Sequence, residues 1–227
     1  MREIGVGSIE ELFQDIPEEL RHARFKLPPP LSELELKKEL SQLADRNISL
    51  DNYACFLGGG SYRHFIPSTV EYVISRSEFY TAYTPYQAEV SQGTLQSTYE
   101  YQSLVCQLTG MEVSNAGMYD GSTAAGEAAI MACLITKRGK VAVSTTVNPA
   151  YREVISAYVK GRNLSMETVD PDPSLSSDCA CLVVQQPNFF GHLEKMEAHA
   201  QKAHDIGALF IAIVDPTSLG MFKPPGH

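Results

Sequence analysis

Short apolar segments alternate with helical segments across the C-terminal half of the chain, and this alternation restricts the fold more than any other feature. Helix patterns begin at Asn148-Pro149 and at Glu194, and each is followed by a strand-like segment. Strands joined by long helical crossovers lie in parallel. We therefore expect an α/β fold with a mostly parallel sheet, helices on both faces, and strands near 140–145, 164–169, 180–185 and 208–214.

A turn of glycine and hydroxyl residues opens an alanine-rich helix just before this alternation. Residues 118–128 read Met-Tyr-Asp-Gly-Ser-Thr-Ala-Ala-Gly-Glu-Ala, and the helix pattern reaches about Thr136. Free N–H groups and the positive end of the dipole make such a helix start attractive to a phosphate. Gly121, Ser122 and Thr123 are the candidate contacts, although hydroxyl residues also cap helices for structural reasons. Asp120 places a negative charge at the same turn, which disfavours a bound dianion.

Polar residues follow two of the expected strands. Asp215 comes directly after segment 208–214, and His192 lies in the loop after segment 180–185. Ligands of parallel sheets bind beyond the carboxyl ends of the strands. We therefore expect the turn at 120–123 and Asp215 to border one crevice.

The first 65 residues are predicted to form a helical N-terminal arm, and residues 66–227 an α/β large domain. Ser8 with Glu11, and Ser32 with Glu35, each have the spacing of a capping box. Within the large domain we expect helices over 68–75 and 95–108, the second ended by Gly110, and a short strand over 111–117.

A triple glycine at residues 58–60, followed by Ser61, lies between the arm and the large domain. It lacks the Gly-Lys-Ser/Thr ending of a phosphate loop, so a flexible turn is the favoured interpretation. Arg63 and His64 follow, and either could face a carboxylate or phosphate, although isolated basic residues are usually solvated.

Charge and cysteine content exclude several classes of function. A net charge of −9 disfavours nucleic acid or an anionic membrane surface as a partner. The sequence contains neither a signal-peptide pattern nor an apolar run of about 18 residues, so we expect a cytoplasmic protein. The five cysteines show no metal-type spacing and their odd number argues against a closed disulfide framework. Cys179 and Cys181 are expected to share one face of a strand as packed thiols.

Three segments together resemble a known family. Residues 83–93 (Tyr-Thr-Pro-Tyr-Gln-Ala-Glu-Val-Ser-Gln-Gly), 101–111 and 119–128 are similar to the P-protein of the glycine cleavage system, in particular to its first subunit. The resemblance covers essentially the whole chain. It implies the large domain of the fold-type I pyridoxal-phosphate enzymes, and it implies that the complete subunit carries further sheet and a small C-terminal domain.

The resemblance also implies a reaction and partners. Glycine loses its carboxylate as CO2 with pyridoxal phosphate as cofactor, and its aminomethyl group passes to the lipoyl arm of the H-protein. The Schiff-base lysine is expected in a second, beta subunit, so no catalytic residue or metal ligand is assigned to this chain. Lys223 lies too close to Asp215 to serve as that lysine.

Roles for individual residues follow from the same resemblance. Asp215 matches a carboxylate that pairs with the pyridinium nitrogen, unless it only caps the next turn. His192 matches a ring that stacks on the cofactor, unless it is an ordinary loop histidine. The resemblance and the composition together place a substrate or subunit contact at Tyr83, Thr84, Tyr86 and Gln87. Two alternatives stay open: a self-sufficient pyridoxal enzyme acting on another amino acid, and a non-catalytic scaffold.

Overall fold

The computed structural model describes residues 2–21, 26–60 and 62–227. The chain divides into two units, Met1–Cys55 and Phe56–His227. Ser61, at the end of the glycine turn, lies outside the described residues. The expected domain boundary after residue 65 stays a prediction.

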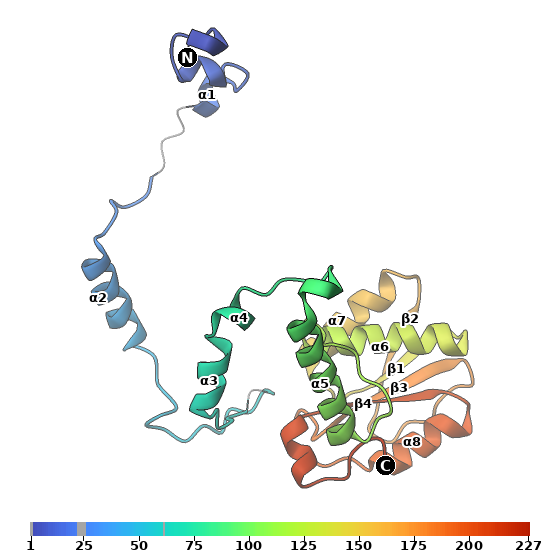
Figure 1. Ribbon diagram of the computed structural model, residues 1–227. Coiled ribbons are helices and arrows are strands. Elements are labelled where there is room, and N and C mark those ends of the chain that lie inside the picture. Colours follow the sequence, from blue (N-terminus) through green and yellow to red (C-terminus); the bar gives the residue numbers. More distant parts are fainter. Residues whose placement is uncertain (1, 22–25, 61) are drawn as a thin grey trace. The chain divides into compact units, whose positions relative to one another are not determined.

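The predicted parallel sheet is present in the second unit (Figure 1). Its four strands are all parallel, run in the order β2-β1-β3-β4, and comprise β1 (Lys140–Ser144), β2 (Ser165–Val169), β3 (Cys179–Gln186) and β4 (Leu209–Val214). The sheet confirms the α/β fold class. Each strand lies within a residue or two of its predicted bounds.

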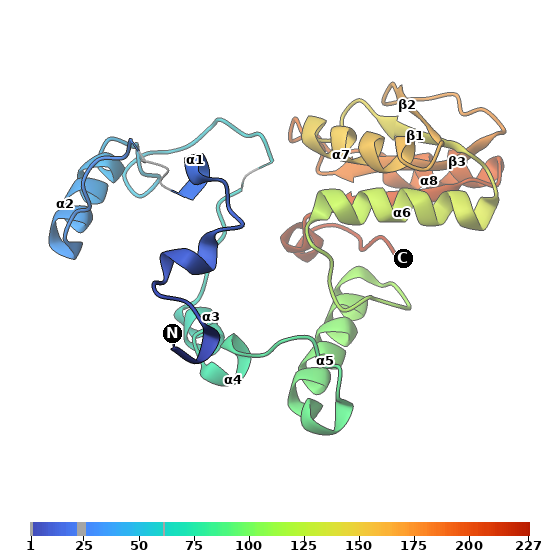
Figure 2. The ribbon, with the colours of Figure 1, turned by 90° about the horizontal axis from the view of Figure 1, so that it is seen from above.

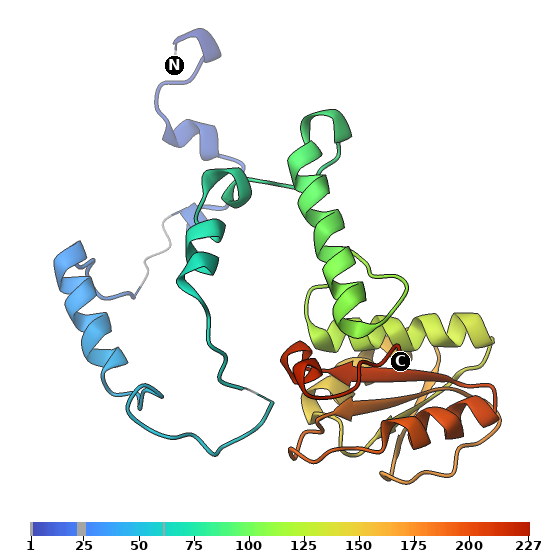
Figure 3. The same ribbon diagram turned by 60° about the horizontal axis from the view of Figure 1, so that its bottom comes forward.

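Helices cover both faces of this sheet, as expected. Helices α6 (Gly121–Thr136) and α7 (Pro149–Lys160) pack with Val141, Val143 and Val183 on one face. Helix α8 (Met196–Asp205) packs with Leu182 and Val184 on the other, so α6 and α8 lie on opposite sides of the sheet (Figure 3). Alanines and Cys133 make the inner face of α6, which allows a close approach to the sheet.

The two cysteines of β3 do not share a face, contrary to the prediction. Cys181 belongs to the core on the α6 side and Cys179 to the core on the α8 side. The pairing with β1 is irregular between Lys140 and Val141, where one step on β1 corresponds to two on β3. An extra residue of this kind reverses the facing of side chains on either side of it.

The segment before α6 is helical but buries little. It contains α3 (Ser68–Ile74), α4 (Ser77–Tyr80), η3 (Ala88–Val90) and α5 (Gln92–Thr109), and α5 is ended by a left-handed Gly110, as predicted. Helix α5 stands away from the sheet (Figure 2). The strand predicted over 111–117 is absent: these described residues have no regular structure, and Asn115 Oδ1 accepts from Gly117 N in a local turn.

The first unit consists of short helices. They are η1 (Arg2–Ile4), η2 (Glu10–Phe13), α1 (Glu18–Arg21) and α2 (Glu33–Ala44). Ser32 and Glu35 form the predicted capping box at α2. The box predicted at Ser8 forms only in part, because the Glu11 carboxylate accepts from Gly7 N instead of Ser8 N.

Candidate functional site

The turn at 120–123 and Asp215 both lie toward the end of the sheet where the strands finish. Helix α6 leads into β1 through a short connection and therefore runs back along the sheet, which brings its first residues to the end where the strands finish. Asp215 directly follows β4 and begins η4 (Pro216–Gly220). We call this end of the sheet, with the turn at 120–123 and Asp215, the crevice edge; that these residues border one crevice stays a prediction.

Asp120 occupies the N-terminus of α6 with its own carboxylate. Its Oδ1 accepts from Thr123 N and from Ser122 Oγ, both at 2.7 Å. Thr123 Oγ1 accepts from Asp120 N at 3.1 Å, which completes a capping box. These bonds, first the one from the Thr123 N–H and then the one from the Ser122 hydroxyl, lower the pKa of Asp120. The Thr123 N–H and the Ser122 hydroxyl are therefore already used by an anion of the chain itself.

The two glycines of α6 make room for tyrosines of α7. A Cβ added to Gly121 would lie 2.5 Å from the Tyr151 hydroxyl oxygen, and one added to Gly126 would lie 2.9 Å from the Tyr158 ring. Sequence reasoning assigned Gly121 to the approach of a phosphate. In the structure its small size accommodates a side chain of the neighbouring helix.

Asp215 is held by two polar neighbours. Its Oδ1 accepts from Thr217 N at 2.9 Å and from the Thr217 hydroxyl, and its Oδ2 lies 3.7 Å from His64 Nε2. The Thr217 hydroxyl is the main cause that lowers the pKa of Asp215, and the nearby His64 contributes to the same shift. The structure thus places His64 beside a carboxylate, one of the two kinds of group that the sequence suggested it could face.

The loop after β3 presents His192 at the surface and is fixed from within. Asn188 Oδ1 accepts from Phe190 N and from His192 N, both at 3.0 Å, and Asn188 N donates to the His192 carbonyl. His192 itself is exposed. Its position therefore depends on the buried side chain of Asn188.

A buried polar network beneath this loop escaped prediction. Glu194 Oε1 accepts from Thr146 Oγ1 at 2.8 Å and from Asn188 Nδ2 at 2.7 Å, and Glu194 Oε2 lies 3.4 Å from His199 Nε2. Burial raises the pKa of Glu194, but the bonds from Asn188, Thr146 and His199 outweigh it, and the net shift is downward. The sequence feature that could have revealed this network is His199, which lies at a buried position of α8.

The four residues of the aromatic loop do not pack within the described chain. Tyr83 is 85% exposed and Tyr86 is 84% exposed, while Thr84 and Gln87 are also exposed. Tyr86 N donates to the Thr84 carbonyl at 2.8 Å, which forms a tight turn. Two tyrosines held outward by a turn are available for contact with another molecule.

Lys223, in the segment after η4, forms an ion pair with helix α8. Its Nζ lies 2.8 Å from Glu197 Oε1 on α8. Both residues border a groove of about 770 Å³ between α8, β4 and the segment after η4. The expectation that Lys223 is not the Schiff-base lysine stays a prediction.

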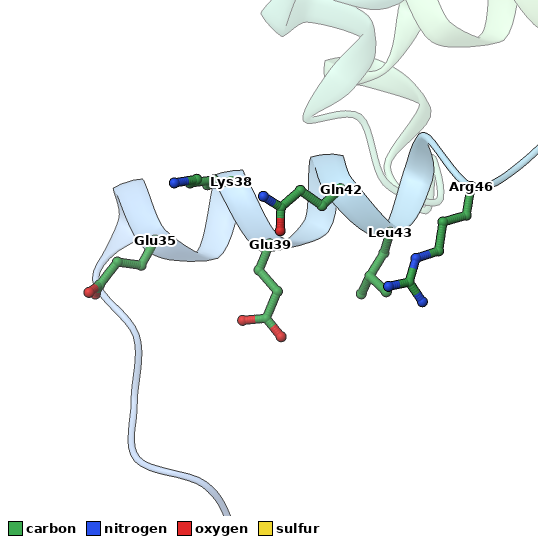
Figure 4. Close-up of a pocket in the computed structure, with 6 residues that line it drawn as sticks. All are labelled: Glu35, Lys38, Glu39, Gln42, Leu43 and Arg46. Atoms are coloured by element: carbon green, nitrogen blue, oxygen red, sulfur yellow. The ribbon is translucent and has the colours of Figure 1, made fainter.

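A second hollow, of about 410 Å³, lies in the first unit and is not a site. All six of its lining residues belong to α2 or follow it directly, and they project from that single helix (Figure 4). No second element faces them within the described residues, so nothing there would converge on a ligand.

The part of the chain that the structure describes contains neither a cluster of metal-ligating side chains nor a helix suited to a membrane. No group of three or more histidine, cysteine, aspartate or glutamate side chains is arranged to hold a metal ion. No helix is both long and apolar enough to cross a bilayer.

The comparisons with known proteins agree with this geometry. A family model described as "Glycine cleavage system P-protein" matches residues 1–227. The chain belongs to this family. Among its P-protein relatives, the "Probable glycine dehydrogenase (decarboxylating) subunit 1" of Geobacillus kaustophilus is 48% identical over 100% of this chain and 53% of its own length. The protein of the same name from Chlorobium phaeobacteroides is 49% identical over 98% of this chain and 53% of its own length.

A solved P-protein structure confirms the fold. It is titled "Crystal structure of glycine decarboxylase (P-protein) of the glycine cleavage system, in inhibitor-bound form", and it matches with a TM-score of 0.87 and 43% identity over 99% of this chain and 52% of that chain. The present chain therefore spans about half the length of the P-proteins that it matches.

The residues at the crevice edge do not fit pyridoxal phosphate, the cofactor that the resemblance implies for P-proteins. The Asp120 carboxylate lies where a phosphate would approach α6, and two like charges so close would repel each other. The carboxylate of Asp215 faces His64. The carboxylates of Asp120 and Asp215 therefore already have partners within this chain.

Proposed function

We propose that this chain is part of the first subunit of a two-subunit P-protein, which decarboxylates glycine and passes the aminomethyl group to the lipoyl arm of the H-protein. The observation that carries the proposal is the match to subunit 1 proteins at 48% identity over the whole chain. Family membership alone does not say which subunit binds the cofactor and which completes the site. The crevice edge suggests how it is divided.

In this proposal pyridoxal phosphate and its lysine belong to the second subunit. The support lies in Asp120, which already caps α6, and in Lys223, which pairs with Glu197. When bound, the cofactor supplies the electron sink for the carbanion left by loss of CO2. The present chain would shape and cover that site from its own side of a subunit contact.

The contact surface is proposed to include the Tyr83–Gln87 turn and the outer side of α5 and α6. Tyrosines that are rigid and amphipathic are favoured at interfaces. The large apolar side chains Leu104 on α5, and Met131 and Leu134 on α6, are all more than half exposed. Their exposure is what a partner subunit would remove.

We also infer a cytoplasmic location, with glycine and the H-protein as partners and without nucleic acid or membrane. The five cysteines are free thiols, as expected in a reducing compartment. The net charge of −9 supports the absence of an anionic partner surface.

Glycine–CO2 exchange tests the proposal. The full-length subunit alone should be inactive, and activity should appear when the second subunit, pyridoxal phosphate and H-protein are added. If the first subunit alone binds pyridoxal phosphate with the corresponding visible band and releases CO2 from glycine, the self-sufficient alternative is correct.

A second experiment separates contribution to the site from scaffolding. Tyr83→Ala and Thr84→Ala should lower exchange at least tenfold in the reconstituted complex while the assembled mass stays unchanged, because these side chains would contact the partner's site. Tyr72→Ala, on exposed α3, is the matched control. Unchanged turnover in the Tyr83 and Thr84 variants would favour the scaffold.

A further inference from the structure

A single carboxylate connects the two loops that follow β1 and β3. Glu194 Oε1 accepts from Thr146 Oγ1, in the loop after β1, and from Asn188 Nδ2, in the loop after β3. The loops are also joined directly, because Phe189 N donates to the Thr146 carbonyl at 2.9 Å. Both bonds to Glu194 Oε1 come from donors, so this oxygen must act as an acceptor.

Asn188 extends this constraint to the tip of the loop after β3. Asn188 is only 2% exposed, and its Oδ1 accepts from Phe190 N and from His192 N. The side chains of Phe190 and His192 are exposed. The backbone that presents these two side chains is therefore fixed through Asn188, and Asn188 is fixed by Glu194.

The second carboxylate oxygen of Glu194 faces a histidine that has one unused nitrogen. His199 Nε2 lies 3.4 Å from Glu194 Oε2, and the two side chains are 8% and 10% exposed. His199 Nδ1 is buried and has no hydrogen-bond partner in the part of the chain that the structure describes. A hydrogen on Nδ1 would be a buried donor without an acceptor, and in the neutral ring it would leave a lone pair directed at the carboxylate. A hydrogen on Nε2 instead supplies the carboxylate with a donor.

We propose that Glu194 is the positioning residue of the loop that carries His192, and that it acts as an ionised carboxylate held by the Nε2–H form of His199. Its charge joins the two loops because the Thr146 hydroxyl, the Asn188 amide and the His199 imidazole all donate to it. A protonated Glu194 would direct a hydrogen at one of these donors, and the loop after β3 would lose its anchor while the sheet stays folded. This role belongs to the loop itself and does not rest on the proposed function.

The surroundings of the pair set the direction of its pH dependence. Burial raises the pKa of Glu194, and its bonded neighbours lower it by more. Asp172, in the segment after β2, pairs with Lys202; its pKa is lowered first by this bond and further by the charges of His199 and Lys195. Because the folded pKa of Glu194 is lowered, the anchor is fully present above the unfolded pKa and is lost as the pH falls through the folded pKa.

Amide hydrogen exchange of the full-length protein tests the role of the charge. In Glu194→Gln one oxygen remains for the donors of the two loops, but an NH2 group replaces the oxygen that faces His199. Exchange of the Phe190 and His192 amides should become about tenfold faster, because hydrogen bonds to a charged group are strong, while the amides of β3 keep their rates. Glu153→Gln, an exposed carboxylate on α7, is the matched control. If Glu194→Gln exchanges like this control, the proposal is overturned.

Two substitutions of His199 separate its hydrogen bonding from its packing. His199→Gln can place an amide N–H near the position of Nε2 and should keep the exchange of the loop within about twofold of the unmodified protein. His199→Leu fills similar space without a donor and should speed the exchange severalfold. Equal effects of the two substitutions would show that the imidazole only fills space, and they would contradict its role in the pair.

Nitrogen NMR of the unmodified protein reports the state of His199 without any substitution. At neutral pH it should show a neutral imidazole with its hydrogen on Nε2. A hydrogen on Nδ1 at this pH, in either the neutral or the charged ring, would overturn the proposed pair.

The pH dependence of exchange gives a second measurement on the unmodified protein. After correction for intrinsic rates, the protection of the Phe190 and His192 amides relative to β3 should fall as the pH drops below 4.5, the ordinary pKa of glutamate. Glu194→Gln should not show this relative fall. A loop that loses protection only together with β3 would contradict its separate release. None of these measurements uses glycine turnover, so this proposal and the proposed function can fail independently.

Discussion

The described residues before Ser122 and those from Ser122 onward, here called the first and second halves, differ in how far they bury their apolar side chains. From Ser122 onward the sheet and its helices bury a core that includes Val141, Leu182 and Val183. Among the described residues before Ser122 none is buried, although α5 has apolar positions at helical spacing and a single charged residue, Glu100. A helix with so little charge and so much exposed apolar surface is typical of an interface. The second half thus buries a core, whereas the apolar side chains of the first half, like those on the outer side of α6, are left for the proposed contact with a partner.

The largest expected effect tests this contrast with one type of substitution in each half. Leu182→Ala removes a fully buried side chain and should lower the free energy of unfolding by about 2–5 kcal/mol. Leu104→Ala removes a side chain that is 58% exposed and should change it by less than about 0.5 kcal/mol in the chain without partners. Urea unfolding followed by circular dichroism measures both. Equal losses would mean that α5 has a core of its own.

Replacing a glycine by alanine should change the free energy of unfolding in opposite directions in the two halves. Gly126→Ala drives a methyl group against the Tyr158 ring and should cost about 1–3 kcal/mol. Gly93→Ala, in the first turn of α5, meets open space and should stabilise by up to about 1 kcal/mol. Thermal unfolding of the two variants is the measurement. A loss of stability at Gly93 would reveal a neighbour there.

Sequence patterns predicted the second half well because its local and tertiary preferences agree. The β4 segment is apolar throughout, and Asn148-Pro149 starts α7 where expected. The facing of Cys179 escaped prediction because one extra residue in β3 reverses it, and no composition signal marks that residue. The strand expected at 111–117 failed because Asn115 and Gly117 form a turn.

At the crevice edge the sequence suggested candidate residues but not their hydrogen-bond partners. Asp120, Ser122, Thr123 and Asp215 were found from their positions at element ends. Their mutual bonds, and the arrival of His64 from about 150 residues earlier, depend on tertiary structure. The Glu194 network was missed for the same reason, because its members come from the loop after β1, the loop after β3, and α8.

Assembly should be sensitive to the exposed apolar helices and not to an exposed apolar loop. Leu134→Lys on α6 and Leu104→Lys on α5 should weaken association with the second subunit at least tenfold, because a buried unpaired charge is costly at an interface. Leu193→Lys, which is 57% exposed in the loop after β3, is the matched control. Sedimentation at several concentrations gives the affinities. If only the control weakens association, the proposed contact surface is wrong.

The smallest effect concerns the border between the two halves, where Asp120 begins the buried part of the chain. Hydrogen bonds in the folded state lower its pKa below the ordinary value of 3.8, so its ionised form is favoured by folding. The resulting stabilisation is fully present above the unfolded pKa and is lost as the pH falls through the lower folded pKa. Asp120→Asn keeps an oxygen for Thr123 N and loses the charge, so its stability deficit at neutral pH should shrink as the pH is lowered below about 4.

Urea midpoints measured between about pH 2.5 and 7 give the difference in stability between Asp120→Asn and the unmodified protein directly. Ser32→Ala at α2, in the first unit, is a control that removes a cap without removing a charge. A deficit for Asp120→Asn that is constant with pH would show that the charge contributes nothing at the α6 N-terminus, and it would remove the main objection to an anion there.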